Sequence, residues 1–387
     1  MLDFDINALQ TPCYVIEEKS LEHNLKILYQ VQQDTDCRIL LAQKAYSTYS
    51  TYPLVGKYLC GTTASSLNEA KLGATYMNGE VHIFAPAYRP DEIDEILEVC
   101  DHIVFNSLNQ WNKYKDKVME MKKNKKLDCG LRINPEYSEI EVDMYNPCLK
   151  NSRFGIRIEE LEGINLTGID GLHFHTMCEQ GSDVLKRTLA VVEEKFGYLL
   201  HQMKWVNFGG GHWITKDDYD IVCLKECICS IRDKYQVQVY LEPGEAVAIN
   251  AGYLISEVLE TGCNGMRTAI MDTSAACHMP DVLEMPYRPE VMSAKNPKEL
   301  SNEELKDSFT YRLGGPTCLS GDVIGDYTFD YELQCGERLV FRDMAMYTTV
   351  KTNTFNGINL PTIYVRRLNG QMDLIREFSY EDFIGRL

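Results

Sequence analysis

Apolar and polar positions between residues 19 and 245 follow a pattern that predicts helices and strands in alternation. In the segment 20–31, Leu21, Leu25, Leu28 and Val31 recur at helical spacing and therefore share one face of a helix. Beyond this segment, short and continuously apolar runs are typical of parallel strands that are buried on both faces. Eight such runs follow one another: RILLAQK (38–44), LCGTT (59–63), VHIFA (81–85), HIVFN (102–106), GLRIN (130–134), GLHFH (171–175), WVNFG (205–209) and VYLEP (239–243).

Helical patterns lie between most of these runs, and the alternation favours an α/β fold. Eight successive strand–helix units predict a (β/α)8 barrel of the TIM type over residues 12–250. A doubly wound open sheet stays open as the alternative, because the number of strands alone does not separate the two folds.

The pattern changes near residue 250, where strand-like segments and turn signals replace the helical periods. A second, C-terminal β domain, a β-barrel or β-sandwich, is therefore expected over residues 251–387, and residues 1–11 are candidates to join it. A short acidic segment, NEELKDS (302–308), is the one helical candidate in this half. The expected strands are GYLISEVLE (252–260), RTAIMDTS (267–274), RLVFRD (338–343), YTTVKTNTF (347–355), TIYVRRL (362–368) and MDLIREF (372–378).

Composition narrows the class of protein. The 387 residues are 44% hydrophobic and 25% charged, which is typical of a folded globular protein. A net charge of −18 argues against a nucleic-acid partner and agrees with a cationic small substrate. No run of 18 apolar residues predicts a membrane span, and the amino terminus does not read as a secretion signal. The fourteen cysteines form no CxxC pair, so we expect reduced thiols, a cytoplasmic protein and no metal site.

Polar residues gather where the predicted barrel strands end. They are Lys44 after the first strand, Arg132 in the fifth, His175 in the sixth, Gly209, Gly210 and Gly211 after the seventh, and Glu242 in the eighth. Functional residues of such barrels lie at the carboxyl ends of the strands. Taken singly, these residues also have structural explanations. Lys44 could simply emerge into solvent, Arg132 could form an ion pair, and His175 could be a core histidine. The glycine run could form a tight turn.

Together these residues suit one cofactor, pyridoxal 5′-phosphate (PLP). Three successive glycines let backbone amides approach a phosphate, and GGGH (209–212) lacks the spacing of a dinucleotide fingerprint. A carboxylate at Glu242 can keep a pyridine nitrogen protonated, and Lys44 can bond to the aldehyde. Burial at the end of an apolar strand would lower the pKa of Lys44 and favour the reactive neutral amine.

Several segments carry a resemblance to a known family over nearly the whole chain: LLAQKAYS, HFHTMCEQ, NFGGGHWIT, YLEPGEAV, GGPTCLSGDVIGDY and MYTTVKTNTFNGINLP. The chain resembles the fold type III PLP decarboxylases, which have an alanine-racemase-like barrel and include ornithine and diaminopimelate decarboxylases. The long segment DTSAACHMPDVLEMPYRP (272–289) is similar to the polyamine branch, the carboxynorspermidine (carboxyspermidine) decarboxylases.

The resemblance implies a role for each matching residue. Lys44 matches the lysine of the internal aldimine, and His175 matches the histidine that stacks on the cofactor ring. Glu242 matches the partner of the pyridine nitrogen, and Gly209 to Gly211 match the phosphate-binding glycines. Arg132 aligns with an arginine near the cofactor, and Tyr347 matches a tyrosine close to the phosphate.

Two further matches concern the substrate. Cys318 in GGPTC matches the proton donor that the second subunit supplies, which implies a homodimer with shared active sites. Asp272 falls where relatives bind the distal amine of the substrate. One departure is Glu245, because relatives have EPGR with an arginine on the phosphate and this chain has EPGE. Glu245 faces either a cationic substrate or solvent; Asp281 and Glu284 are other candidates for binding ammonium groups.

The resemblance thus implies decarboxylation of carboxynorspermidine or carboxyspermidine in polyamine biosynthesis. A diaminopimelate or ornithine decarboxylase is one alternative, since it would share every cofactor residue. A non-catalytic regulatory homologue is the other; the presence of both Lys44 and Cys318 argues against it.

Overall fold

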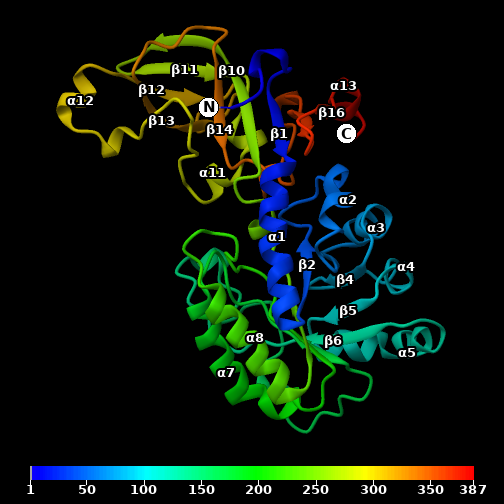
Figure 1. Cartoon of the computed structure of the whole chain (residues 1–387). Coiled ribbons are helices and arrows are strands. Elements are labelled where there is room, and N and C mark those ends of the chain that lie inside the picture. Colours follow the sequence, from blue (N-terminus) through cyan, green and yellow to red (C-terminus); the bar gives the residue numbers. More distant parts are fainter. Residues whose placement is uncertain (1) are drawn as a thin grey trace. The chain divides into compact units, whose positions relative to one another are not determined.

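The structure is a computed structural model that describes residues 2–387, and the chain divides into two compact units. One unit is Glu22–Val247. The other combines the residues up to Leu21 with Ala248–Leu387. Figure 1 labels the helices and strands of both.

The unit Glu22–Val247 is a closed barrel of eight strands in chain order. Each neighbouring pair is parallel, and the last strand closes the barrel against the first. This closure confirms the TIM-type fold and excludes the doubly wound open sheet. All eight predicted strands are present: β2 (Arg38–Ala42), β3 (Gly61–Ala64), β4 (Glu80–Phe84), β5 (His102–Phe105), β6 (Asp128–Arg132), β7 (Gly171–His173), β8 (Trp205–Asn207) and β9 (Gln238–Leu241).

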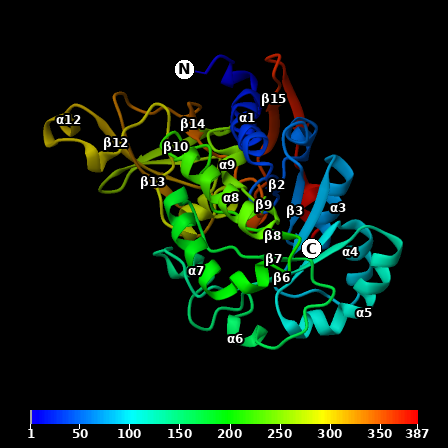
Figure 2. The same ribbon diagram turned by 60° about the horizontal axis from the view of Figure 1, so that its bottom comes forward.

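Helices follow the strands and cover the outside of the barrel, as Figure 2 shows for α3, α4, α5, α7 and α8. Ser66, Ser107 and Asp220 cap three of these helices, because their side chains accept hydrogen bonds from backbone amides of the first turn. The helices are α1 (Glu18–Thr35), α2 (Tyr52–Val55), α3 (Leu67–Tyr76), α4 (Ile93–Val99), α5 (Leu108–Asn124), α6 (Ile158–Leu161), α7 (Ser182–Leu200), α8 (Ile221–Tyr235) and α9 (Glu245–Ala248).

A large side chain packed against glycines fills part of the barrel interior. Trp205 of β8 is buried and packs with Leu40, Val104 and Tyr240. A Cβ atom added at Gly171 would lie 2.0 Å from the Trp205 indole. Gly171 on β7 must therefore be glycine, because the Trp205 indole of the neighbouring β8 occupies the space that a side chain would need.

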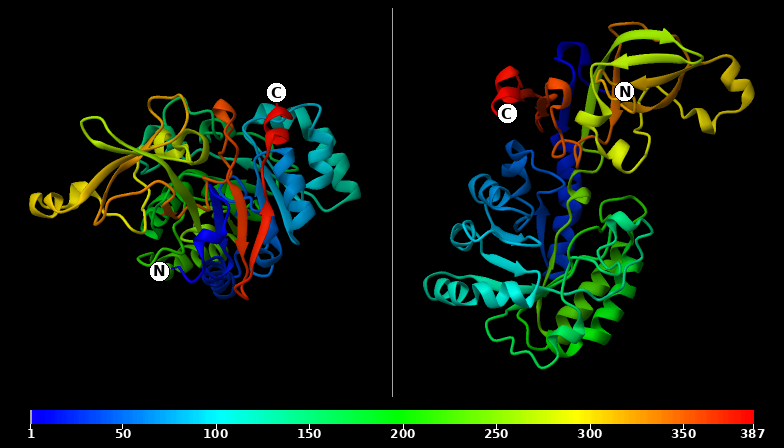
Figure 3. Two further views of the ribbon diagram at one scale, coloured as in Figure 1. Left: turned by 90° about the horizontal axis from the view of Figure 1, so that it is seen from above. Right: turned by 180° about the vertical axis from the view of Figure 1, so that it is seen from behind.

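The second unit is built on a mixed sheet that includes the first strand of the chain. The order is β13-β12-β11-β10-β1-β15-β16, and β14 also pairs with β10. β1 is antiparallel to β10 and parallel to β15. The antiparallel β15 and β16 lie side by side as the orange and red arrows of Figure 3, left. The strands are β1 (Cys13–Glu17), β10 (Gly252–Cys263), β11 (Arg267–Met271), β12 (Phe309–Gly314), β13 (Val323–Phe329), β14 (Arg338–Arg342), β15 (Thr362–Arg366) and β16 (Met372–Arg376).

One predicted strand of this unit is wrong, and three strands were not predicted. The segment 347–355 forms turns, because Tyr347 has a φ of 49° and its carbonyl accepts a hydrogen bond from the Lys351 amide. The sequence analysis missed β1, β12 and β13. The predicted acidic helix is present as α12 (Asn302–Lys306); the other short helices are α10 (Ala275–His278), α11 (Asp281–Glu284) and α13 (Tyr380–Ile384).

Two further observations bear on the chain as a whole. Among the described residues, no helix has both the length and the apolar character needed to cross a membrane. All fourteen cysteines are free thiols.

Candidate active site

Lys44 lies in a turn just past the end of β2, at the carboxyl end of the barrel. The Ala45 amide closes this turn by donating to the Ala42 carbonyl at 3.1 Å. Lys44 is exposed to solvent, in contrast to the predicted burial. Even so, the surrounding protein atoms displace enough water to lower its pKa, and the Arg132 charge lowers it further. The lowered pKa favours the neutral amine that bonds to an aldehyde.

Glu242 follows β9 and is held by two neighbours. Asn207 Nδ2 donates to its Oε1 at 2.8 Å, and His173 Nε2 lies 3.2 Å from its Oε2. Burial raises the pKa of this carboxyl, but the His173 charge and hydrogen bond and the Asn207 amide outweigh burial and lower the pKa to about 2. Glu242 is therefore a carboxylate at neutral pH, as a partner of a protonated pyridine nitrogen must be.

The sequence analysis missed His173 and Asn207, although a signal for both was present. His173 ends β7 and Asn207 ends β8, so each stands at the barrel end where functional residues are expected. Both are almost fully buried. Their position next to Glu242 depends on the pairing of β7 with β8 and of β8 with β9, and the linear pattern does not show the register of these pairs.

His175 and the three glycines lie together next to Glu242. His175 has a pKa well below its usual value because of burial and the nearby Lys44 and Arg132 charges, so its ring is neutral. Its Nδ1 accepts a hydrogen bond from the Gly210 amide at 2.9 Å, which places the ring proton on Nε2. The loop therefore fixes the tautomer of this histidine.

Backbone geometry requires glycine at all three positions. Gly209 and Gly211 have φ angles of 71° and 85°, in the left-handed region. A Cβ atom at Gly210 would lie 2.3 Å from the Glu242 carbonyl oxygen, and one at Gly211 would lie 2.0 Å from that of Met177. The Gly209 and Gly210 amides already donate to Asn207 and His175, so these two have acceptors inside the chain.

Arg132 is buried between two aromatic rings at the same end of the barrel. Its guanidinium carbon lies 4.5 Å from the Phe84 ring centroid and 4.4 Å from that of Phe154. One guanidinium nitrogen donates to the His175 carbonyl at 3.2 Å. Burial lowers the pKa of Arg132 to about 10, so the group keeps its charge at neutral pH and acts on Lys44 and Glu242. The structure thus places Arg132 with the other predicted barrel residues.

Cys318 belongs to the second unit, on a loop that a buried aspartate organises. Asp322 accepts hydrogen bonds from the Ser274 hydroxyl at 2.9 Å and from the Thr317 hydroxyl at 2.7 Å. The Cys318 amide donates to Asn356 Oδ1 at 2.8 Å, while the residue itself is exposed. Asp322, which organises this loop, is a third residue that the sequence analysis missed.

The remaining predicted residues also lie in the second unit. Tyr347 is half-buried, next to its turn. Asp272 Oδ1 accepts from the Ser256 hydroxyl at 2.7 Å and from the Glu257 amide at 2.9 Å, and burial raises the Asp272 pKa. Asp281 and Glu284 both pair with Lys351. Contacts of these carboxylates with a substrate stay predictions.

The barrel residues fit PLP. A lysine with a lowered pKa follows β2, an ionised and largely buried carboxylate follows the neighbouring strand β9, and a neutral histidine lies beside a loop that only glycine can form. These are the groups that a protein contributes to hold an aldehyde, a pyridine nitrogen and a phosphate.

Comparison with known proteins agrees with this fit. The family model for the pyridoxal-dependent decarboxylases, described by its C-terminal sheet domain, matches residues 13–345. A carboxynorspermidine/carboxyspermidine decarboxylase of Campylobacter jejuni is 45% identical over 97% of this chain and 98% of its own length. A carboxyaminopropylagmatine decarboxylase of Synechocystis is 42% identical over 99% of this chain and 96% of its own length.

Solved structures show the same relationship. The structure of carboxynorspermidine decarboxylase from Campylobacter jejuni, complexed with norspermidine, superposes with a TM-score of 0.90 at 43% identity and covers 98% of this chain and 100% of that one. Diaminopimelate decarboxylase from Helicobacter pylori shares the fold, with a TM-score of 0.82 at 16% identity over 98% of this chain and 97% of that one. These findings confirm the predicted family and cofactor and set aside the non-catalytic alternative. The chain belongs to the pyridoxal-dependent decarboxylases and is a PLP-dependent carboxy-lyase.

Proposed function

We propose that the enzyme decarboxylates carboxynorspermidine, carboxyspermidine or both, and so forms norspermidine and spermidine in polyamine biosynthesis. The observation that carries this proposal is the full-length similarity, at 45% and 35% identity, to two decarboxylases named for these substrates. Four diaminopimelate decarboxylases among the curated relatives are 22–25% identical.

The chemistry of the site supports the proposal. When bound, PLP accepts the electron pair that remains on the α-carbon after CO2 leaves. Glu242, ionised and held by His173 and Asn207, keeps the proton on the pyridine nitrogen. Lys44 supplies the amine that anchors the cofactor aldehyde. The neutral ring of His175, fixed by the Gly210 amide, would stack on the cofactor ring.

Glu245 is proposed to face the cationic substrate rather than the phosphate. It begins α9, is half-buried, and its charge acts on Lys44, so it belongs to the same end of the barrel. A carboxylate repels phosphate and attracts ammonium groups. A substrate with several ammonium groups suits this position better than a substrate with a second carboxylate.

Cys318 is proposed to return the proton to the α-carbon from the partner subunit of a homodimer. Its exposed position on an anchored loop supports this role. A cytoplasmic location is proposed because fourteen free cysteines are typical of a reducing compartment.

A second substrate candidate is carboxyaminopropylagmatine. The relative named for this substrate is 42% identical, only slightly less than the carboxynorspermidine/carboxyspermidine enzyme at 45%. Its substrate is also a carboxylated polyamine, so the same PLP-binding residues would serve it.

The test is CO2 release by the purified holoenzyme from carboxynorspermidine, carboxyspermidine, carboxyaminopropylagmatine, diaminopimelate and ornithine, each assayed separately. We expect release from the first two, and loss of that release in Lys44→Ala. The matched control Lys57→Ala, a lysine on the barrel unit away from the site residues, should keep it. Preference for diaminopimelate or ornithine would overturn the proposed substrate, and undiminished release by Lys44→Ala would overturn the assigned anchor.

A further inference from the structure

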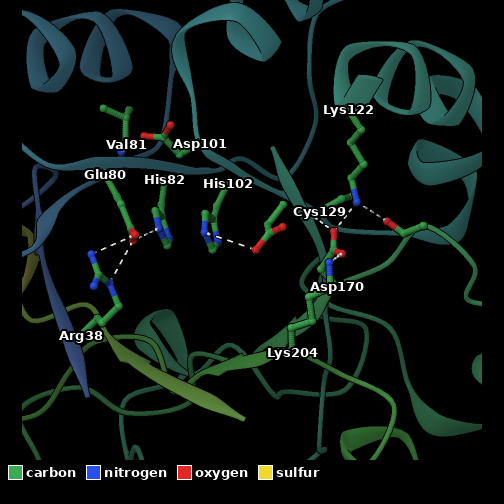
Figure 4. Close-up of polar contacts among 12 residues, drawn as sticks. Arg38, Glu80, Val81, His82, Asp101, His102, Lys122, Cys129, Asp170 and Lys204 are labelled. Carbon is green, nitrogen blue, oxygen red and sulfur yellow. Dashed lines mark hydrogen bonds and ion pairs between the residues drawn. The ribbon is translucent and has the colours of Figure 1, made fainter. Parts of the chain in front are cut away.

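A group of metal-ligand side chains lies at the end of the barrel opposite to the active site. Glu80 opens β4, His82 stands two residues further on the same strand, and His102 opens β5. His82 and His102 are paired in the register of these two strands. Because residues two apart on a strand face the same side, Glu80 and His82 project together. Figure 4 shows the three side chains in a row with Arg38.

The three side chains are already close enough to share one ion. One ligand atom of each lies within 4.8 Å of those of the other two. Glu80 Oε2 is 3.1 Å from His82 Nε2, and the imidazole rings of His82 and His102 stack with centroids 3.8 Å apart. Binding would therefore need small side-chain rotations and no movement of the strands.

His102 supplies an independent indication of a missing ligand. The residue is only 4% exposed, and its buried Nδ1 has no hydrogen-bond partner. Its Nε2 lies 3.8 Å from Asp128 Oδ2, which is too long for a hydrogen bond. A buried imidazole nitrogen with no hydrogen-bond partner is costly, and coordination of an ion by Nδ1 would remove that cost.

The carboxylates around the two histidines are partly exposed, so an ion can reach the site and its positive charge can be balanced. The side chains of Glu80 and Asp128 are about one-fifth exposed, whereas both imidazoles are nearly closed off from solvent. Arg38 contacts both carboxylate oxygens of Glu80, Oε1 at 2.9 Å and Oε2 at 3.4 Å, so it holds the carboxylate with Oε2 beside His82. The Arg38 charge works against a cation here, and the Glu80 and Asp128 carboxylates offset it.

We propose that Glu80, His82 and His102 form a binding site for a divalent first-row transition-metal ion such as Zn²⁺. Two imidazole nitrogens and one carboxylate oxygen are a ligand set that Zn²⁺ uses, with water in the fourth position. Mg²⁺ and Ca²⁺ prefer oxygen ligands and are excluded by the two imidazoles. The sequence analysis expected no metal because it searched for cysteine pairs, whereas this site joins two neighbouring strands.

The test uses holoenzyme without a polyhistidine tag, freed of metal by a chelator and titrated with Zn²⁺ by calorimetry. We expect one ion per chain and a Tm that rises with Zn²⁺. His102→Phe keeps an aromatic ring on His82 but removes the ligand, so it should bind at least about tenfold more weakly and lose the Tm shift. His201→Phe is the matched control, because His201 is exposed and packs against Tyr235.

A second variant covers the case in which His102→Phe does not fold, and a Cu²⁺ spectrum identifies the ligand atoms. Glu80→Gln should weaken Zn²⁺ binding by a similar factor, and it replaces His102→Phe if that variant does not fold. Cu²⁺ bound to the wild type should show nitrogen coupling in its electron paramagnetic resonance spectrum. Equal Zn²⁺ binding by the wild type and both variants would show that the ion binds to thiols or to other histidines. No Zn²⁺ binding by the wild type would show that Glu80, His82 and His102 form only a polar network. Either result would overturn the proposal.

Discussion

At the scale of single residues, the site depends on how a buried carboxylate keeps its charge. Glu242 stays ionised because Asn207 and His173 replace the hydrogen bonds of water. The sequence predicted Glu242 from its place after a strand, and for the same reason it predicted Lys44. It did not predict Asn207 and His173 as supports of Glu242, because this contact depends on the register in which β7, β8 and β9 pair, and the linear pattern does not show that register.

Asn207→Asp should test this support with little change of shape. The new carboxylate keeps an acceptor for the Gly209 amide but replaces the Nδ2 donor with a like charge beside Glu242. We expect the Glu242 pKa to rise by about 2 units or more, since a lost hydrogen bond to a charged group is worth about 1.5–3 kcal/mol and repulsion adds to it.

Because the Glu242 pKa rises, the variant should lose activity on the acid side of its pH profile. The wild-type Glu242 pKa is about 2, so the group stays ionised and active until the pH falls to that range. In Asn207→Asp the acid limb of the kcat profile should therefore move to higher pH by about 2 pH units, whereas kcat at neutral pH should change little because Glu242 stays ionised there. Asn302→Asp, on the exposed α12, is the control with the same charge change. An unmoved acid limb would show that Asn207 does not support Glu242.

At the scale of elements, hydrophobic runs predicted the barrel strands well and the sheet of the second unit less well. The eight runs are strands because both of their faces are buried, which gives a signal that needs no partner information. The segment 347–355 has a strand-like composition, but the left-handed conformation of Tyr347 starts a turn in place of a strand. Such turns follow from the contacts of the loop, which the composition does not specify.

Gly171→Ala should test the packing of neighbouring strands inside the barrel. The added methyl group would lie 2.0 Å from the Trp205 indole, so the indole or the strand must move. We expect a loss of about 1–3 kcal/mol in the free energy of unfolding, measured by urea titration. Gly321→Ala is the control, because a Cβ atom there meets nothing within 4 Å. Equal stability of the two variants would contradict the packing argument.

At the scale of the whole molecule, the account requires two chains for each active site. Lys44 and Glu242 come from the barrel of one subunit, and Cys318 is proposed to come from its partner. Two inactive variants with defects on opposite sides of the interface should therefore restore each other when mixed.

Mixing Lys44→Ala with Cys318→Ala should restore about a quarter of the wild-type rate of amine formation, because half of the dimers are mixed and each carries one intact site of two. Amine formation is measured rather than CO2, since Cys318 acts after CO2 has left. Mixing Lys44→Ala with Glu242→Gln is the control, in which every mixed site keeps a barrel defect. Activity that stays at the level of the single variants in the first mixture would contradict the shared site.

The central claim is the choice of substrate, and competition within one reaction tests it most directly. The holoenzyme would receive carboxynorspermidine, carboxyspermidine, carboxyaminopropylagmatine and diaminopimelate at equal concentrations, and the amine products would be separated and quantified at early times. Their ratio reports the ratio of kcat/KM values. The account predicts that norspermidine and spermidine together dominate the products; a majority of aminopropylagmatine or of lysine would contradict it.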